Sequence, residues 1–203
     1  MNWAAVILAA GRSSRMGSSH KLLEELCGKP LINHVIISAI GMHLSPVLLV
    51  TGYRRADVMA LAPAQGVQEV FNPDFASGMM ASVRCGLRAV PETCEGAVML
   101  LGDMPMITAQ HIQTTIGALQ ARPDCLAAVP VYHGQWGHPV VMRRGLFGSV
   151  MDLSGDQGAR AVLKAHRERV VEVPMDDPAI LLDLDTPEEL ALARQNGARP
   201  VKA

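Results

Sequence analysis

Short runs of Val, Ile, Leu and Ala alternate with longer segments of helical periodicity along most of this chain. This alternation is typical of βαβ units, in which parallel strands form one sheet and the intervening helices cover its two faces. We expect strands at residues 4–9, 47–51, 68–71, 97–101, 126–131, 139–142 and 170–173, and helices at residues 31–42, 55–61, 79–89, 109–121, 158–166 and from 187 onward. The pattern therefore predicts an α/β fold with a three-layer, doubly wound, mostly parallel sheet.

The length of the chain, 203 residues, suits one substantial hydrophobic core. No internal repeat and no Gly/Ser-rich or Pro-rich linker divides it. We expect a single domain over residues 1–195, with a first half of about 1–132 and a second half of about 133–195, where the rhythm of the pattern changes. Residues 196–203 are expected to form a flexible tail.

Charge and cysteine usage exclude several classes of protein. The formal net charge is −1, and neither sign forms a block that would attract nucleic acid or a membrane surface. The cysteines lie far apart without a C-x-x-C pair, which argues against a zinc site and a redox motif; they are Cys27, Cys85, Cys94 and Cys125. No stretch reaches the roughly 20 apolar residues of a membrane helix, and the apolar start lacks the basic residues of a signal peptide. We therefore expect a cytoplasmic protein.

The first predicted strand runs into a loop of small and basic residues, Leu8-Ala9-Ala10-Gly11-Arg12-Ser13-Ser14-Arg15-Met16-Gly17, and Lys21 follows. Small residues let backbone N–H groups approach phosphate oxygens, and the basic side chains supply positive charge. The loop is not a Walker A motif, because no Gly-Lys-Ser/Thr follows, and Ser13 replaces the second glycine of a dinucleotide fingerprint. The sequence thus favours a triphosphate site over an ordinary turn with solvated arginines.

The predicted strand at 97–101 ends in Gly102-Asp103-Met104-Pro105. In a doubly wound sheet, ligands gather outside the carboxyl ends of the strands, so Asp103 is expected near the triphosphate loop. Magnesium is commonly held by one or two carboxylates together with phosphate oxygens. We interpret Asp103 as a metal ligand, with a simple turn aspartate as the alternative.

A third candidate segment, Asn72-Pro73-Asp74-Phe75-Ala76-Ser77-Gly78-Met79-Met80-Ala81-Ser82, follows the predicted strand at 68–71. The Asn72 amide could bind a base or ribose, and Gly78 and Ser82 would allow close approach at the start of a helix. An Asn-Pro turn followed by a helix start is the alternative.

Taken together, these segments resemble the molybdopterin nucleotidyltransferases from Ala5 to about Arg194. The segments that match in order are the first loop with Lys21, Val50-Thr51-Gly52-Tyr53-Arg54, the Asn72–Ser82 stretch, Gly102-Asp103-Met104-Pro105, Gly137-His138-Pro139 and Asp183-Leu184-Asp185-Thr186-Pro187. The resemblance implies a Rossmann-like, glycosyltransferase-A-like nucleotidyltransferase fold. Ala9-Ala10-Gly11, where guanylyl-transferring relatives typically have Ala-Gly-Gly, favours CTP as the nucleotide and therefore a cytidylyl-transferring member.

The resemblance also implies roles for individual residues. Asp103 and Asp185 would hold Mg²⁺, and Lys21 and Arg15 would be catalytic. The nucleotide-binding residues would be Leu8, Ala9, Ala10, Gly11, Arg12, Ser13, Thr51, Gly52, Asn72, Gly78 and Ser82. The acceptor would be molybdopterin, with or without molybdenum, and its terminal phosphate would attack the α-phosphorus of CTP. A phosphate monoester is already anionic at neutral pH, so no general base is needed.

Acceptor binding is assigned to two Gly-containing segments of the second half. Gly137 and His138 begin one predicted strand, and Gly158 and Arg160 begin a predicted helix. The alternative is structural: a His before Pro at a strand entry, and a solvated helix Arg.

Three alternatives for the whole protein stay open at this point. GTP could replace CTP, a sugar or polyol phosphate could replace molybdopterin, or the chain could be a non-catalytic assembly factor that carries cofactor. With molybdopterin as the acceptor, or with a cofactor-carrying role, the expected protein partner is a molybdenum hydroxylase or its maturation factor.

Overall fold

The computed structural model describes residues 2–13, 20–63, 65–153 and 158–195. Its centre is an eight-stranded sheet in the order β10-β7-β9-β6-β1-β4-β5, with β8 paired to β7. These strands are β1 (Trp3–Ala9), β4 (Val47–Thr51), β5 (Val67–Phe71), β6 (Gly96–Leu101), β7 (Ala127–Tyr132), β8 (Gln135–Trp136), β9 (Val140–Arg143) and β10 (Val170–Pro174). The predicted strands are thus confirmed within a few residues.

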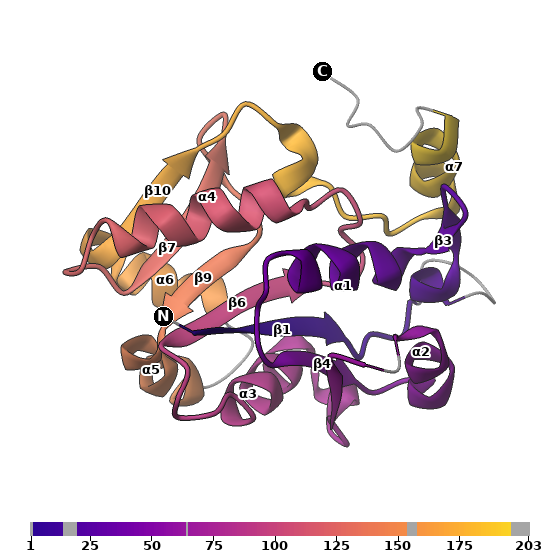
Figure 1. The fold of residues 1–203 in the computed structure, drawn as a ribbon, viewed down its shortest axis with the longest axis horizontal. Coiled ribbons are helices and arrows are strands. Elements are labelled where there is room, and N and C mark those ends of the chain that lie inside the picture. The colour runs from indigo at the N-terminus through magenta and orange to yellow at the C-terminus, as the bar shows by residue number, and fades with distance from the viewer. Residues whose placement is uncertain (1, 14–19, 64, 154–157, 196–203) are drawn as a thin grey trace.

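The sheet is mostly parallel, with β9 inserted in the opposite direction and β8 antiparallel to β7. β1 runs parallel to β4 and β6, β4 to β5, and β7 to β10. β9 lies antiparallel between β6 and β7. The parallel pairs bring the carboxyl ends of β1, β4 and β6 to one edge of the sheet, and Figure 1 shows the arrowheads of β1 and β6 pointing to the side where α2 and α7 lie.

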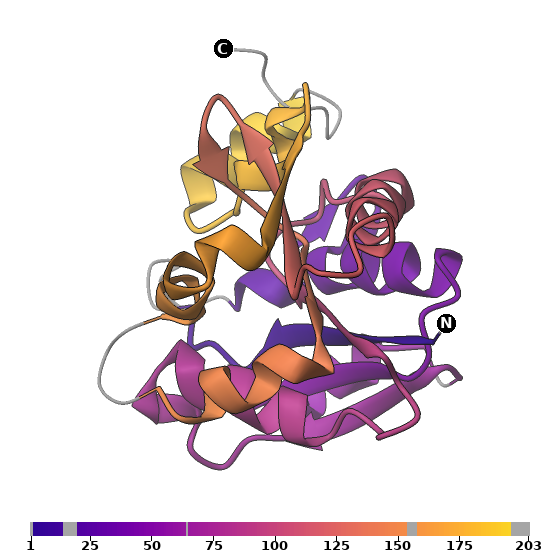
Figure 2. The ribbon, with the colours of Figure 1, turned by 90° about the vertical axis from the view of Figure 1, so that its left-hand side faces the viewer.

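Helices cover both faces of the sheet, which confirms the predicted three-layer α/β fold (Figure 2). One face packs against α1 (Leu31–Gly41), α2 (Arg55–Leu61) and α4 (Ala109–Gln120). The other packs against α3 (Met79–Arg88), α5 (Phe147–Met151) and α6 (Ala159–Ala165). A separate small cluster joins α7 (Pro187–Gln195) to the two-stranded β2–β3 hairpin, β2 (Glu25–Leu26) and β3 (Lys29–Pro30).

Capping bonds confirm the predicted starts of α4 and α7. Thr108 accepts a bond from the His111 backbone N–H at the start of α4, at 3.4 Å. At α7, Thr186 Oγ1 accepts from the Glu189 N–H at 3.2 Å, and Glu189 Oε2 accepts from the Thr186 N–H at 2.9 Å. This reciprocal capping box fixes where α7 begins.

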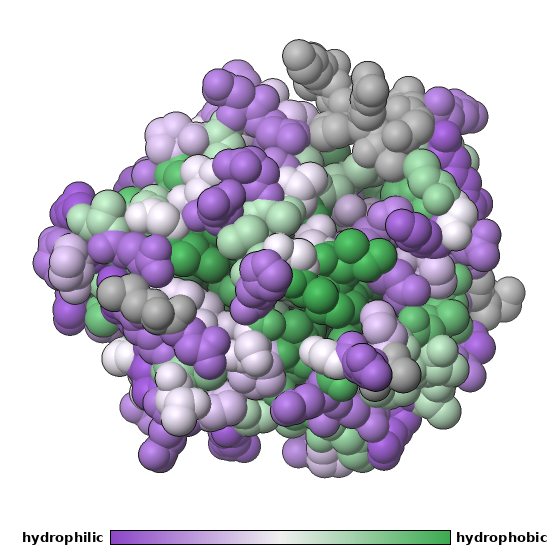
Figure 3. Space-filling view, viewed as in Figure 1, coloured by the Kyte–Doolittle hydropathy of each residue, from purple (hydrophilic) through white to green (hydrophobic). Residues whose placement is uncertain are grey.

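The surface is mixed in character. Figure 3 shows apolar side chains gathered over α1 near the middle of one face, and Ile37 and Ile40 of that helix are exposed. None of the described helices is long and apolar enough to cross a membrane.

Candidate functional site

A cavity of about 330 Å³ opens at the carboxyl ends of β1 and β6. It brings together residues from five separate parts of the chain: Leu8, Ala9, Ala10, Gly11, Ser13, Lys21, Leu22, Phe75, Gly78, Met79, Ser82, Leu101, Asp103, Asp183 and Asp185. Most of the residues that the sequence assigned to nucleotide and metal binding therefore lie around one cavity. Arg15 lies outside the described residues, and so does the expected tail at 196–203.

Lys21 lines this cavity and connects two acidic residues of its wall. Its ammonium forms ion pairs with the carboxylates of Asp103 and Asp185, the latter at 2.5 Å from Nζ to Oδ1. Burial alone would lower the pKa of Lys21, but the charges and hydrogen bonds of the two aspartates outweigh it and raise that pKa. The three side chains are only 13%, 19% and 25% exposed, so solvent screens their charges weakly.

Asp103 and Asp185 reach the cavity from segments that are bonded to each other. Asp103 follows β6, and its carbonyl accepts a 2.9 Å bond from the Leu184 N–H. The backbone N–H of Asp185 donates to Glu189 Oε2 at 2.8 Å, so the α7 capping box also holds Asp185. The buried Oδ1 of Asp103 has no hydrogen-bond partner among the described residues.

Asp183 is a third acidic residue at this cavity, and the sequence analysis did not select it. Burial raises its pKa, and the nearby negative charges of Asp185 and Asp103 act in the same direction. Its position could have been inferred from the alternation around the buried Leu184, which places residues 183 and 185 on the same side of an extended segment.

Four predicted nucleotide-binding residues do not line the cavity: Arg12, Thr51, Gly52 and Asn72. Asn72 is 3% exposed; its amide donates to Ser82 Oγ at 3.0 Å and accepts from the Asp74 N–H at 3.0 Å. The buried Thr51 hydroxyl donates to Glu69 at 2.6 Å. These bonds fix the loop that carries Gly78 and Ser82 and the end of β4.

Gly52 has a packing requirement of its own. A Cβ atom there would lie 2.5 Å from Cβ of Phe75 and 2.8 Å from Cβ of Ala10. The absence of a side chain at Gly52 therefore lets the first loop and the Phe75 turn meet. Arg12 stacks over the Phe75 ring, 5.5 Å from its centroid.

The predicted acceptor residues Gly137, His138, Gly158 and Arg160 do not line this cavity. Gly137 is buried, and a Cβ atom there would lie 2.3 Å from the carbonyl oxygen of Ile180, so close packing explains this glycine. Gly158 is the N-cap of α6, and Arg160 donates to the carbonyl of Trp136 at 2.6 Å. Arg160 lines a second cavity, which Gly137, His138 and Gly158 do not line.

His138 stays neutral inside the fold. Burial lowers its pKa to about 4, and the positive charge of Arg160 acts in the same direction while Asp103 opposes it. The buried Nδ1 atom of His138 has no hydrogen-bond partner among the described residues.

Within the described residues, no group of three or more His, Cys, Asp or Glu side chains is arranged to hold a metal ion. A site with one or two carboxylates does not require such a group, because substrate phosphates and water complete the shell of Mg²⁺.

Comparison with known proteins decides the family. The model of the MobA-like NTP transferase domain matches residues 5–170. The chain belongs to the MobA-like NTP transferase family. The chain is therefore a nucleotidyltransferase, which agrees with the enzyme class that the sequence predicted.

Two full-length relatives support this membership. The chain is 30% identical over 191 residues to the molybdenum cofactor cytidylyltransferase of Escherichia coli, covering 94% of each protein. It is 32% identical over 199 residues to the purine catabolism protein PucB of Bacillus subtilis, covering 94% of this chain and 95% of that protein. The bifunctional protein GlmU of Sorangium cellulosum is 34% identical over 132 residues, but the match spans 62% of this chain and only 28% of GlmU.

Solved structures agree with the fold. Rv0371c from Mycobacterium tuberculosis superimposes with a TM-score of 0.83 at 27% identity, over 96% of this chain and 98% of that chain. Rv0371c in complex with manganese superimposes with a TM-score of 0.77 at 25% identity, over 96% and 99%.

Proposed function

We propose that this MobA-like enzyme transfers CMP from CTP to the terminal phosphate of molybdopterin, with or without bound molybdenum. The observation that carries the proposal is the ion-paired group of Lys21, Asp103 and Asp185 beside the first loop. The full-length likeness to the E. coli cytidylyltransferase, together with Ala9-Ala10-Gly11 in the first loop, supports CTP and molybdopterin as the substrates.

The proposed transfer requires no general base from the protein. A phosphate oxygen of the acceptor forms a bond to the α-phosphorus of CTP, the bond from that phosphorus to the bridging oxygen of the β-phosphate breaks, and pyrophosphate leaves with the electron pair. The acceptor oxygen is already ionised at neutral pH, so no proton has to move. The residues of the site therefore act by positioning and by neutralising charge.

We assign the metal to Asp103 and Asp185. Two observations fit a cation site. The buried Oδ1 of Asp103 has no hydrogen-bond partner among the described residues, and the Lys21 ammonium already lies between the two carboxylates. When bound, Mg²⁺ supplies positive charge to the phosphate oxygens and fixes their orientation. The manganese complex of Rv0371c, a protein of the same fold, supports a divalent cation here.

The remaining residues are assigned by their place around the cavity. Residues 8–13 bind the triphosphate with their backbone, and Lys21 faces the leaving pyrophosphate. Gly78 and Ser82 form the opposite wall, and Asn72, Thr51 and Gly52 hold that wall in place. Residues 1–132 form the nucleotide-binding half of a single domain over 1–195, and residues 133–195 form the acceptor-binding half.

The test is turnover with a matrix of substrates. Purified enzyme with Mg²⁺ is incubated with each of the four nucleoside triphosphates, and each is paired with molybdopterin, N-acetylglucosamine 1-phosphate or a polyol phosphate. We expect pyrophosphate release and a cytidine dinucleotide product, seen by mass spectrometry, only with CTP and molybdopterin. Turnover with GTP instead of CTP would show that GTP is the nucleotide substrate. Turnover with a sugar phosphate instead of molybdopterin would show that the sugar phosphate is the acceptor. No turnover with any pair would favour a non-catalytic role in delivering cofactor to a molybdenum hydroxylase.

A further inference from the structure

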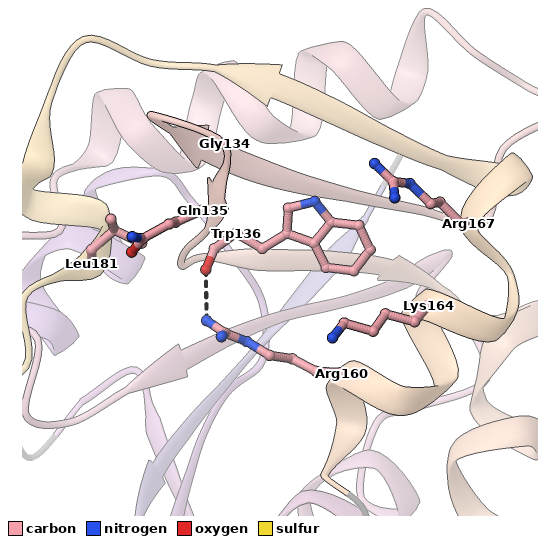
Figure 4. A pocket seen from close by; sticks show the side chains of 7 residues that line it. All are labelled: Gly134, Gln135, Trp136, Arg160, Lys164, Arg167 and Leu181. Atoms are coloured by element: carbon pink, nitrogen blue, oxygen red, sulfur yellow. Dashed lines mark hydrogen bonds between the residues drawn. The ribbon is translucent and has the colours of Figure 1, made fainter.

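A second cavity, of about 790 Å³, lies between β8 and α6, and its lining does not belong to the nucleotide site. It is lined by Gly134, Gln135, Trp136, Arg160, Lys164, Arg167 and Leu181. Figure 4 shows Arg160, Lys164 and Arg167 around Trp136, with Gln135 and Leu181 beside each other. It therefore has room for a sizeable ligand.

Positive charge dominates this cavity. Arg160 and Lys164 lie four residues apart on α6, so both face the same side of the helix, and Arg167 follows its end. Arg167 pairs with Glu172 at 3.0 Å, and Arg160 donates to a backbone carbonyl. Within the described residues the Lys164 side chain forms no ion pair or hydrogen bond, so its exposed ammonium is available to an anion.

An aromatic ring stands among these cations. The Trp136 Nε1–H donates to Glu172 Oε1 at 3.0 Å, which holds the indole in one orientation. Figure 4 shows that ring between Arg167 on one side and Lys164 and Arg160 on the other. A flat, half-exposed ring of fixed orientation flanked by cations suits a planar, electron-rich or anionic ligand.

The second cavity adjoins the nucleotide site. Trp136 and Leu181 line the second cavity. Two residues after Trp136 lies His138, which is close enough to Arg160 and Asp103 to sense the charges of both. Two residues after Leu181 lies Asp183, which lines the first cavity. One extended ligand could therefore occupy both cavities.

We propose that the cavity between β8 and α6 binds the planar, anionic body of the acceptor, with its ring stacked on Trp136 and its charge met by Lys164 and Arg160. This assignment rests on the proposed function and deepens it. The acceptor class it defines is a phosphate monoester that carries a heteroaromatic ring and further negative charge, as the pterin and dithiolate of molybdopterin do. A simple sugar phosphate offers neither feature.

The first measurement is direct binding without CTP or metal. In a Trp3→Phe background Trp136 is the remaining tryptophan, and titration with molybdopterin is expected to quench its fluorescence. Adding Lys164→Met should weaken the binding by on the order of tenfold, because a charge-assisted contact is lost. Lys29→Met, which removes the same charge from the β2–β3 hairpin, should leave it unchanged. Absence of quenching, or equal affinity in the Lys164 and Lys29 variants, would overturn the proposal.

The second measurement is steady-state kinetics with the acceptor varied at saturating CTP. Lys164→Met and Trp136→Leu should raise the acceptor KM by roughly tenfold without changing the CTP KM, and Trp136→Phe should retain most acceptor binding because it keeps a ring. Molybdopterin that binds Trp136 but accepts no CMP would refute the proposed function and leave this binding site standing. Efficient transfer to a ringless sugar phosphate with the same KM in all variants would refute the binding site and leave nucleotidyl transfer intact.

Discussion

Lys21 joins two carboxylates that are far apart in sequence, lying 82 and 164 residues from it. A cation held in this way needs no reorganisation when negative charge builds on the leaving pyrophosphate, which is the condition for stabilising a transition state. The same positive charge also reduces the repulsion between the two carboxylates. Lys21 is therefore the residue on which the chemistry should depend most.

Replacing Lys21 with Ala should lower kcat by on the order of 10²-fold, because the fixed positive charge is lost from the transition state. CTP binding should weaken as well. Initial-rate measurements over a range of CTP concentrations would check both effects. A raised CTP KM with unchanged kcat would instead make Lys21 a ground-state anchor.

Asp103→Asn and Asp185→Asn should each remove nearly all turnover while leaving the far-UV circular dichroism spectrum unchanged. An amide keeps the shape of the side chain but loses the charge that a divalent cation requires. Rates measured across a Mg²⁺ titration test this, with Asp124→Asn as a control at an exposed Arg–Asp pair away from the cavity. If either variant keeps a near-normal rate at limiting Mg²⁺, the substituted aspartate is not a metal ligand.

His138 should make stability depend on pH. Its pKa is about 4 in the fold because it is buried, against an ordinary value of 6.5. Between these two values the unfolded chain binds a proton that the folded chain does not, so stability is full above pH 6.5 and falls as the pH drops toward 4. The expected contribution between pH 7 and pH 5 is about 2 kcal/mol.

Urea unfolding of the wild type and of His138→Gln at pH 7 and pH 5 checks this contribution. Between pH 7 and pH 5, the free energy of unfolding should fall by about 2 kcal/mol less in the variant than in the wild type. Equal losses in the two proteins would mean that His138 is accessible to protons in the fold.

At the scale of elements, the α7 capping box does more than start a helix. Glu189 Oε2 accepts from the backbone N–H groups of both Asp185 and Thr186, so the cap of α7 fixes the backbone that carries a proposed metal ligand. Glu189 does not line the cavity, which makes it a positioning residue.

Glu189→Ala should lower kcat several-fold and raise the Mg²⁺ concentration needed for half-maximal rate, and the free energy of unfolding should fall by about 1 kcal/mol. Glu189→Gln keeps an accepting oxygen and should restore the Mg²⁺ dependence. Glu188→Ala, one position earlier on the same helix, serves as the control. If Ala and Gln at position 189 behave alike, the carbonyl-type acceptor is not what positions Asp185.

The elements that the sequence predicted well are those with strong periodicity or caps. β1, β4 and β6 are almost entirely apolar runs, and α4 and α7 have capping residues at their starts. The two-residue strand β8 and the five-residue helix α5 were not predicted, because segments of that length carry no period. The reversed direction of β9 is a property of its long-range pairing and leaves no local signal.

The candidate site was predicted to a similar extent. Strand ends pointed to the first loop and Asp103, since parallel strands deliver their carboxyl ends to one edge. The inward bonds of Asn72 to Ser82 and Asp74 could not be inferred, because a loop amide can face either solvent or the interior. Of the residues around the second cavity, the sequence singled out Arg160 but not Trp136 or Lys164, since that cavity depends on packing between α6 and β8.

On the scale of the whole molecule, both cores draw on both halves of the chain. The core on the α1 side joins Ile7 and Val35 to Val141 and Val173, and the core on the α3 side combines residues from the two halves in the same way. Neither half could bury its apolar surface without the other. Residues 1–195 should therefore unfold as one cooperative unit.

Tryptophan fluorescence can test this cooperativity, because Trp3 lies in the first half and Trp136 in the second. In Trp3→Phe and in Trp136→Phe, the remaining tryptophan should report the same urea midpoint as the far-UV circular dichroism of that variant. A fluorescence transition displaced from the circular dichroism transition in either protein would indicate that the halves unfold separately.

The link between Lys21, Asp103 and Asp185 also sets an order of events during synthesis. A growing chain acquires the triphosphate loop first and Asp103 midway, while Asp185 comes after every strand of the sheet. A partly synthesised chain thus carries the proposed phosphate-binding loop without the second proposed metal ligand and without the helix whose cap holds it. If the proposed site is correct, we expect competence for transfer to appear only once the segment around Asp185 has been made.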